Sequence, residues 1–249
     1  MEFIEIQKDA GIAKVILYRG KVNALNDTVV EELHSTVIDL EKDPNVKAII
    51  ISGNGKFFSF GFDIPEFLSY SKQKFTDYLT RFTDLYTYIF TYPKPVIAAI
   101  NGHAVAGGCM LASACDKRVM VSGKAKISLN EISFGSSVFA GSTEMLRFCV
   151  GDKNATEILY SGRMYSAEEA KDLGLIDIIT NENNLMKDAS KLALELGERP
   201  APAFASIKSL LRKSVAEEME LKEKESIQRF VDIWYSESTW KNLKDLKIY

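Results

Sequence analysis

The sequence predicts an α/β protein with mainly parallel strands, and three observations support this expectation. Up to about residue 180, short apolar runs with strand character alternate with segments of helical periodicity. An apolar run at 95–100 leads directly into a glycine-rich elbow and an apolar helix start. From about Asn181 onward the pattern is helical only. The 249 residues, 46% of them hydrophobic, can form one globular unit with a sizeable core and an appendage.

The first part of the chain repeats a strand-then-helix pattern. The expected elements are strands at 3–6 and 13–17, a helix capped by Asp27, a strand at 46–51, helical segments at 65–90, a strand at 96–100, a helix at 107–113 and a strand at 118–121. Periodicity alone leaves two arrangements open, a doubly wound sheet and a spiral of ββα units.

The tail is expected to contain three helices, at 185–197, 203–215 and 217–235. The segment 199–202, which contains two prolines, separates the first two. The charged run at 217–225 mixes both signs, which fits a solvated helix face as well as a subunit contact.

Composition excludes several classes of partner. A net charge of −3 provides no basic surface, so we expect neither a nucleic acid nor a membrane partner. The longest apolar stretch, 96–111, is interrupted by polar residues and glycines and falls short of the roughly 20 residues that span a bilayer. The three cysteines lack metal-ligand spacing, so no metal site is expected. Together with an N-terminus unlike a targeting peptide and a 247–249 tripeptide unlike the peroxisomal signal, they indicate a cytoplasmic protein.

Two glycine turns are candidates for a ligand site. Gly107 and Gly108 stand between the strand at 96–100 and the next helix, where an anion can approach the backbone without meeting a Cβ. On its own such a pair is common before a helix, and a packing elbow is then the favoured explanation. Upstream, Gly61 and Asp63 follow a second strand, so two strand ends could face one pocket.

Six ordered motifs cover nearly the whole chain. They are Val22-Asn-Ala-Leu-Asn26, Phe58-Ser-Phe-Gly-Phe-Asp63, Lys94-Pro-Val-Ile-Ala-Ala-Ile-Asn-Gly102, Ala106-Gly-Gly108, Leu129-Asn-Glu131 and Tyr165-Ser-Ala-Glu-Glu-Ala-Lys-Asp-Leu-Gly-Leu-Ile176. In this set the chain resembles the crotonase superfamily, also called the enoyl-CoA hydratase/isomerase family, whose members hold a thioester enolate with two backbone N–H groups. The resemblance implies a crotonase-like spiral of ββα units at 1–195 with the CoA-thioester site. It also implies a C-terminal helical region at 196–249 that drives assembly as a homotrimer or hexamer.

The resemblance also implies the catalytic residues. The N–H groups of Phe62 and Gly107 become the oxyanion donors, and Glu131 becomes the base. Glu131 lies in an otherwise apolar segment, where burial would raise its pKa towards a useful range. Without the resemblance, an exposed glutamate at a helix cap would be the simpler interpretation. Hydratases carry a first glutamate three residues after the oxyanion glycine, where this chain has Met110, which cannot transfer a proton.

The 136–141 segment departs from the hydratase pattern as well, because Phe139 replaces a small residue. A drier pocket with one carboxylate suits proton transfer between C2 and C4 of one ligand, so the chain resembles the Δ3,Δ2-enoyl-CoA isomerase branch. The alternatives are a hydratase or decarboxylase, in which Glu144 could act as a second acid, and a non-catalytic acyl-CoA binding protein. No cofactor is expected, since coenzyme A is part of the substrate.

Substrate contacts are expected in two places. The resemblance implies that Lys21, with its neighbour Arg19, lies at the entrance for coenzyme A, where either residue can attract phosphate. The 57–64 loop, with Gly61 and Asp63, is expected along the adenine and pantetheine. Gly108, Met110 and Phe139 are expected near the acyl group, and further candidates for its lining are Phe67, Phe82, Leu85, Tyr86 and Phe134. Structural roles are expected for Asp63 and Asp116 as caps and for His103 as a packed imidazole.

Overall fold

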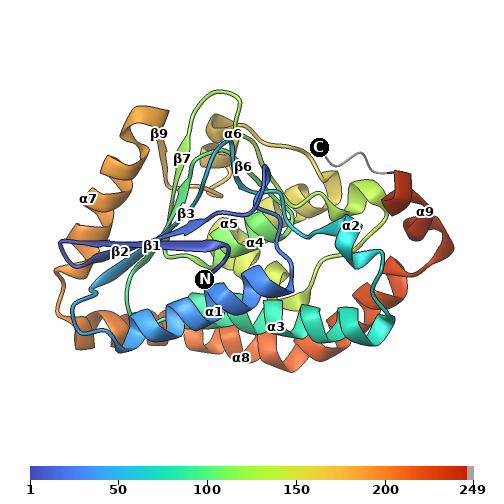
Figure 1. The fold of residues 1–249 in the computed structure, drawn as a ribbon, viewed down its shortest axis with the longest axis horizontal. Coiled ribbons are helices and arrows are strands. Elements are labelled where there is room, and N and C mark those ends of the chain that lie inside the picture. The colour runs from blue at the N-terminus through green and yellow to red at the C-terminus, as the bar shows by residue number, and fades with distance from the viewer. Residues whose placement is uncertain (246–249) are drawn as a thin grey trace.

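Two sheets with mainly parallel strands form the centre of the computed structural model, which describes residues 1–245 (Figure 1). The larger sheet has the order β1 (Ile4–Asp9), β2 (Ile12–Leu17), β3 (Ala48–Gly53), β5 (Val96–Ile100), β7 (Lys117–Val121) and β9 (Ile178–Thr180). Only β1 runs antiparallel to its neighbour. The smaller sheet has the order β4 (Phe57–Ser59), β6 (His103–Val105) and β8 (Ile127–Ser128). The 247–249 tripeptide, which was compared with the peroxisomal signal, lies outside the described residues. The same holds for the last residues of the predicted C-terminal region.

From β3 onward, consecutive strands alternate between the two sheets. The pairs β3–β4, β5–β6 and β7–β8 each place one strand in each sheet, and a helical segment follows each pair. This is the expected spiral of ββα units, and it excludes a single doubly wound sheet. Glycine allows the abrupt change of sheet: a Cβ on Gly102, between β5 and β6, would lie 1.9 Å from the Lys56 carbonyl oxygen.

The first helix, α1 (Asp27–Lys42), begins as expected but with a different cap. The side chain of Asn26, not Asp27, accepts the Val29 N–H at 3.1 Å. Asp27 instead pairs with Arg81 of α3 (Lys72–Thr91) and accepts a hydrogen bond from the Tyr70 hydroxyl. Asparagine and aspartate are both favourable at a helix N-cap. Because the Asp27 side chain is engaged by Arg81 and Tyr70, the Asn26 side chain caps α1.

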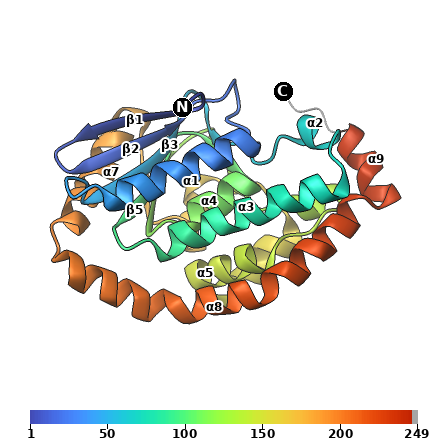
Figure 2. The same ribbon diagram turned by 60° about the horizontal axis from the view of Figure 1, so that its bottom comes forward.

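The remaining helices cover the sheets on different sides. They are α2 (Ile64–Phe67), α4 (Gly107–Ala114), α5 (Ala140–Ser161), α6 (Ala167–Asp172), α7 (Leu185–Gly197), α8 (Ala201–Trp234) and α9 (Glu237–Asp245), with 3₁₀ turns η1 (Glu131–Phe134) and η2 (Glu182–Asn184). Helix α7 packs on β3, β5 and β7, whereas α8 extends beneath α3 and α5 (Figure 2). The expected boundary at 195 therefore falls in the last turn of α7. The division into two regions and the oligomeric state stay predictions.

Helix α8 is one continuous helix, so the expected pair of helices at 203–215 and 217–235 was wrong. Neither glycine nor proline stands between the two segments, and Ala216 is buried against the core. The N-terminal half of α8 is anchored by the half-buried Asp116, whose carboxylate lies 2.7 Å from Lys208 Nζ and 3.2 Å from Arg212. Asp116 also accepts the Val96 N–H at 2.8 Å, which confirms its structural role. Burial lowers the pKa of Lys208 to about 8.

Within residues 1–245, none of the helices has the length and apolar character needed to cross a bilayer. The same residues contain no group of three or more metal-ligating side chains placed to hold an ion. Cys109 and Cys115 are buried free thiols, and Cys149 is a half-buried one. The cytoplasmic location stays a prediction.

Candidate active site

Three segments with predicted site residues follow the three strands of the smaller sheet. Phe62 follows β4, Gly107 follows β6 and Glu131 follows β8. Because parallel strands end at the same edge of a sheet, these segments come together at one place. The strands of the smaller sheet need only two or three residues, because each of them positions a single turn at that edge.

Pairing with the segment at 23–26 orients the backbone at Phe62. The Leu25 N–H donates to the Gly61 carbonyl at 2.8 Å, and the Asp63 N–H donates to the Leu25 carbonyl at 3.4 Å. Since these two groups face Leu25, the N–H of Phe62 faces the opposite side. Within residues 1–245 it donates to no protein acceptor. It is therefore available to a ligand oxygen.

The side chain of Phe62 holds this backbone in place. Its ring lies edge-on to Phe82 at 5.0 Å between centroids and to Tyr78 at 5.4 Å. Phe67 is a third neighbour at 5.9 Å. Such aromatic packing stabilises a fixed ring orientation. A large residue at position 62 thus immobilises the loop that carries the N–H group.

The second N–H group belongs to Gly107, the first residue of α4. Ala106 before it has φ +50° and ψ −120°, an unusual conformation for a residue with a side chain. The Ala106 N–H donates to Ser128 of β8 at 2.8 Å and fixes this elbow. In the described part of the chain the Gly107 N–H has no protein acceptor, as expected for the first turn of a helix. A Cβ on Gly61 would lie 3.0 Å from Gly107 N, so the two N–H segments are in contact.

Gly108 makes this approach possible, and its replacement provides a test. A Cβ at Gly108 would lie 2.3 Å from the Ser59 carbonyl oxygen, so backbone would have to move. We expect Gly108→Ala to lower the free energy of unfolding by about 1–3 kcal/mol, although alanine favours helices. Gly107→Ala is the matched control with a smaller expected loss, because its Cβ would meet the Phe62 ring at 3.1 Å. Urea unfolding measures both, and equal stabilities for the two variants would contradict this account.

Glu131 is buried at the start of η1, so the alternative of an exposed cap residue was wrong. The exposed fraction of Glu131 is only 4%. Among residues 1–245, its Oε2 atom has no hydrogen-bond partner. Burial raises the pKa of Glu131 to about 8 from an ordinary 4.5. A carboxylate with this pKa can both take up and return a proton near neutral pH.

The cavity beside Glu131 has a volume of about 140 Å³. Of the described residues that line it, Glu131 is the only carboxylate. The others are Phe60, Phe62, Ile64, Val105, Ala106, Asn130, Phe134, Phe230 and Trp234. Phe230 and Trp234 were not predicted as cavity residues; they come from α8, about a hundred positions after Glu131. Two aromatic residues at helical spacing carry no local signal that distinguishes a cavity wall from ordinary core.

The raised pKa of Glu131 predicts how stability depends on pH. Between pH 4.5 and about 8 the folded chain keeps a proton on Glu131 that the unfolded chain has lost. The stability contributed by this group therefore falls as pH rises through that range. We expect Glu131→Gln to lack this component, so its stability relative to the parent protein should increase from pH 5 to pH 8. Thermal unfolding at several pH values checks this, and a constant difference between the two proteins would contradict it.

A second pocket, of about 390 Å³, adjoins the cavity through the shared residues Phe60 and Phe62. Lys21, Arg19 and Asp63 line it, so three predicted binding residues lie together. Arg19 is already paired with Asp63 at 2.7 Å. Asp63 also caps α2 by accepting the Glu66 N–H at 3.0 Å, which confirms the expected capping role. This arrangement leaves Lys21 as the candidate for binding a ligand phosphate.

The other predicted residues are close to the site but not in the cavity lining. Met110 is buried within α4. The Phe139 ring packs behind the cavity lining. Its centroid lies 4.4 Å from that of the Phe230 ring and 6.3 Å from that of the Phe62 ring. Of the further candidates for the acyl lining, Phe134 alone is among the lining residues. The remaining ones, Phe67, Phe82, Leu85 and Tyr86, are buried core residues.

Glu144 and His103, which the sequence analysis considered as possible catalytic residues, are both engaged in contacts with neighbouring side chains. The Glu144 carboxylate lies 3.3 Å from Arg147 and 3.5 Å from Lys222 and is not among the residues that line the cavity. The His103 ring packs on Phe57 at 5.1 Å between centroids, as expected for a packed imidazole. Burial lowers the pKa of His103, so its neutral form is favoured.

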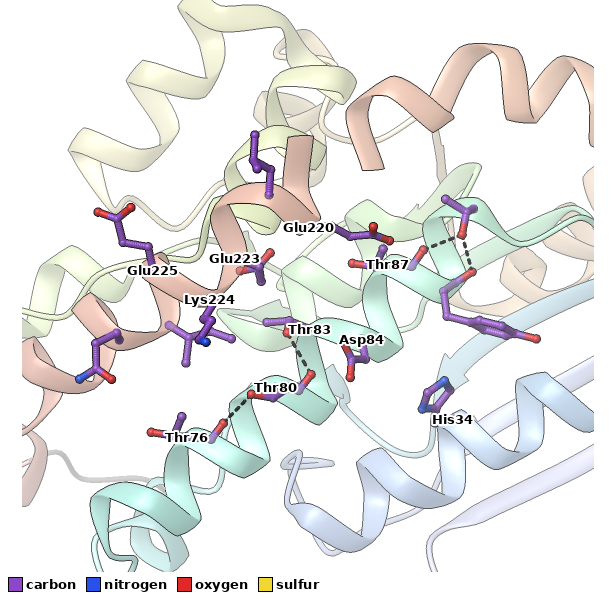
Figure 3. Close-up of a pocket in the computed structure, with 15 residues that line it drawn as sticks. His34, Thr76, Thr80, Thr83, Asp84, Thr87, Glu220, Glu223, Lys224 and Glu225 are labelled. Atoms are coloured by element: carbon purple, nitrogen blue, oxygen red, sulfur yellow. Dashed lines mark hydrogen bonds between the residues drawn. The ribbon is translucent and has the colours of Figure 1, made fainter. Parts of the chain in front are cut away.

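A larger groove of about 1190 Å³ lies between α3 and α8 (Figure 3). His34, Asp84 and Glu223 are among its lining residues, and none of its lining residues is shared with the Glu131 cavity. Thr80 and Thr83 donate to carbonyl groups of their own helix. The described residues that line the groove include neither Glu131 nor Phe62 and Gly107 with their N–H groups, so the smaller cavity is the candidate active site.

Known proteins resemble the chain over most of its length. A sequence profile described as enoyl-CoA hydratase/isomerase matches residues 7–244. A Bacillus subtilis (strain 168) protein named as a probable enoyl-CoA hydratase is 36% identical, with 95% of this chain and 92% of that protein covered. The mitochondrial enoyl-CoA hydratase of Pongo abelii is 34% identical, over 87% of this chain and 76% of that protein.

Solved structures agree in fold. The human mitochondrial Δ3,Δ2-enoyl-CoA isomerase superposes with a TM-score of 0.92 at 26% identity, covering 97% of this chain and 95% of that one. An enoyl-CoA hydratase from Bacillus halodurans has a TM-score of 0.90 at 25% identity, covering 98% and 100%. The profile, the relatives and the shared fold together show that this chain belongs to the enoyl-CoA hydratase/isomerase family.

Proposed function

We propose that the protein is a Δ3,Δ2-enoyl-CoA isomerase that uses Glu131 as its single base. The observation that carries the proposal is the cavity lining, in which Glu131 is the one carboxylate of the described residues and its neighbours are mainly apolar. Moving a proton between two carbons of one ligand needs one group that accepts and returns it. Adding water to a double bond needs, in the usual hydratase arrangement, a second carboxylate.

The proposed reaction has two proton transfers. The Glu131 carboxylate removes a proton from C2 of a 3-enoyl thioester, and the electron pair moves onto the thioester oxygen as a dienolate. The N–H groups of Phe62 and Gly107 hold that oxygen, which is where negative charge develops. Protonated Glu131 then returns the proton to C4, and the 2-enoyl thioester forms. The proposal includes no cofactor apart from the coenzyme A of the substrate.

The proposed substrate orientation follows from the two adjoining pockets. The pocket with Lys21 is assigned to the coenzyme A part, because a lysine can attract its phosphates. The cavity beside Glu131 is assigned to the acyl part, because its walls are apolar. Phe60 and Phe62 line both pockets, so the thioester would lie at their junction.

Hydration is the second candidate function, because the two relatives described above bear the name of enoyl-CoA hydratase. A hydratase or decarboxylase with this cavity would need an acid or a water held by other groups. An acyl-CoA binding protein without activity is the third alternative, and Met110 in place of a family glutamate keeps it open.

One experiment separates these functions. Purified protein is incubated with 3-hexenoyl-CoA, and formation of the conjugated 2-enoyl thioester is followed by absorbance, with crotonyl-CoA hydration measured in parallel. We expect conjugation with negligible hydration. Predominant hydration would replace the proposal by a hydratase, and coenzyme A ester binding without turnover of either substrate would favour the binding protein.

A further inference from the structure

We propose that the cavity beside Glu131 accepts a short acyl group and that Phe230 and Trp234 set the limit of its length. The proposal rests on the proposed function, since it places the acyl part of a thioester next to Glu131. It adds a substrate class, short-chain 3-enoyl thioesters, and assigns specificity to residues of the C-terminal helix α8.

The volume of the cavity sets the size of the group that it can hold. It measures about 140 Å³. For comparison, an engineered apolar cavity of about 150 Å³ in another protein binds benzene, a molecule of six carbon atoms. The reacting atoms C2 to C4 must lie beside Glu131 and occupy part of this space. Room therefore remains for only a few carbons beyond the double bond.

Aromatic rings close the cavity on the α8 side. Phe230 and Trp234 are each only 1% exposed, and their rings stack on one another at 5.7 Å between centroids. Phe139 supports Phe230 at 4.4 Å, and Phe75 supports Trp234 at 4.8 Å. A longer acyl chain would have to displace rings that are already packed on both sides, which close-packed interiors resist.

Polar contacts hold the C-terminal half of α8 in position. The Tyr235 hydroxyl, directly after α8, donates to the Tyr70 carbonyl at 2.7 Å. At the start of α5, the Gly141 N–H donates to Glu223 at 2.8 Å and the Ala140 N–H donates to Ser226 at 3.0 Å. Contacts on both sides of Phe230 and Trp234 therefore restrain the helix. Phe230 and Trp234 therefore form a fixed boundary of the cavity.

Another part of the cavity lining, Phe60 and Phe62, is shared with the pocket that contains Lys21. A thioester that enters from there places its acyl end towards α8. Trp234 is therefore positioned to meet the terminal carbons of the acyl chain. Its indole Nε1 atom has no hydrogen-bond partner within residues 1–245, so replacing the indole removes no hydrogen bond of the described chain.

The test is a chain-length series of 3-enoyl-CoA substrates with six, eight, ten and twelve acyl carbons. For the parent protein we expect kcat/KM to fall more than about tenfold between six and ten carbons, since a single misfitting methylene costs about 10–200-fold. Trp234→Ala and the milder Trp234→Leu should raise the ratio of ten-carbon to six-carbon activity. Ile233→Ala is the matched control, because this neighbour on α8 is exposed and is not among the lining residues. Its ratio should equal that of the parent protein.

Binding separates this inference from the proposed function. Calorimetry with hexanoyl-CoA and decanoyl-CoA, which contain no double bond to move, should show tighter binding of hexanoyl-CoA by the parent protein. If no substrate is isomerised but this preference is present, the isomerase proposal fails and the length limit stands. Equal kcat/KM and equal binding across the series would overturn the limit, whatever the variants do. An unchanged ratio in folded Trp234→Ala and Trp234→Leu would overturn the role of Trp234.

Discussion

Replacing Glu131 by glutamine is expected to lower kcat for 3-hexenoyl-CoA isomerisation by about 10²–10⁴-fold, the usual contribution of a general base. The amide has nearly the shape of the carboxylate but cannot accept the C2 proton. Burial already disfavours the charged form of Glu131, as its raised pKa of about 8 indicates. A neutral amide should therefore be accommodated without loss of the fold, and the absorbance assay measures the loss of activity directly.

Glu144→Gln is the matched control for this variant. Glu144 is a second partly buried carboxylate, but Arg147 and Lys222 surround it and it does not line the cavity. We expect isomerase activity near that of the parent protein. Wild-type activity in Glu131→Gln would remove Glu131 from the mechanism, and a large loss in Glu144→Gln would point to a second acid and to hydratase-like chemistry.

Several strands of the larger sheet could be predicted because they contain runs of buried apolar residues with clear ends, whereas β9 was not predicted. The 48–51 and 96–100 segments are examples, and both pair in parallel register, with Ile49 opposite Val96. The second sheet gave no such signal, since β6 has three residues and β8 has two. Periodicity needs several residues to be recognised. The resemblance to known enzymes, not the pattern, therefore predicted the spiral.

The helical tail illustrates a different limit. Proline in the 199–202 segment marked the break before α8 correctly. The second break, expected at position 216, had no breaker residue behind it, and α8 is continuous there. Local propensity cannot show that Ala216 is buried, because burial depends on helices distant in the sequence.

The candidate site was partly accessible from the sequence. Glu131 was unusual as a carboxylate in an apolar segment, whereas the pair Gly107 and Gly108 became a candidate only together with the other motifs. Their convergence at one edge of the small sheet depends on tertiary pairing, which no local pattern contains. Phe230 could not be assigned at all, because an aromatic residue on an amphipathic helix is usually ordinary core.

Removing the Gly107 N–H is expected to lower kcat by about 10²–10³-fold, as found when one oxyanion donor is lost. Replacing Gly107 by glycolic acid during translation converts the amide to an ester and leaves the shape of the chain nearly unchanged. The expected loss reflects the dienolate oxygen, which would keep only the Phe62 N–H. Rates with 3-hexenoyl-CoA measure this loss, while binding of hexanoyl-CoA should change much less because no charge develops in that ligand.

An ester also weakens the preceding carbonyl as an acceptor, so the control must share that defect. Ala167 provides it, because this residue is likewise the first of a helix, and the carbonyl of the residue before it accepts the N–H four positions further along the chain. The Ala170 N–H donates to Ser166 at 2.9 Å, as the Met110 N–H donates to Ala106 at 3.0 Å. Lactic acid at 167 should therefore cost similar stability and no activity. Equal activity of the two esters would show that the Gly107 N–H does not hold the oxyanion, whereas loss at 107 alone would identify it as a donor.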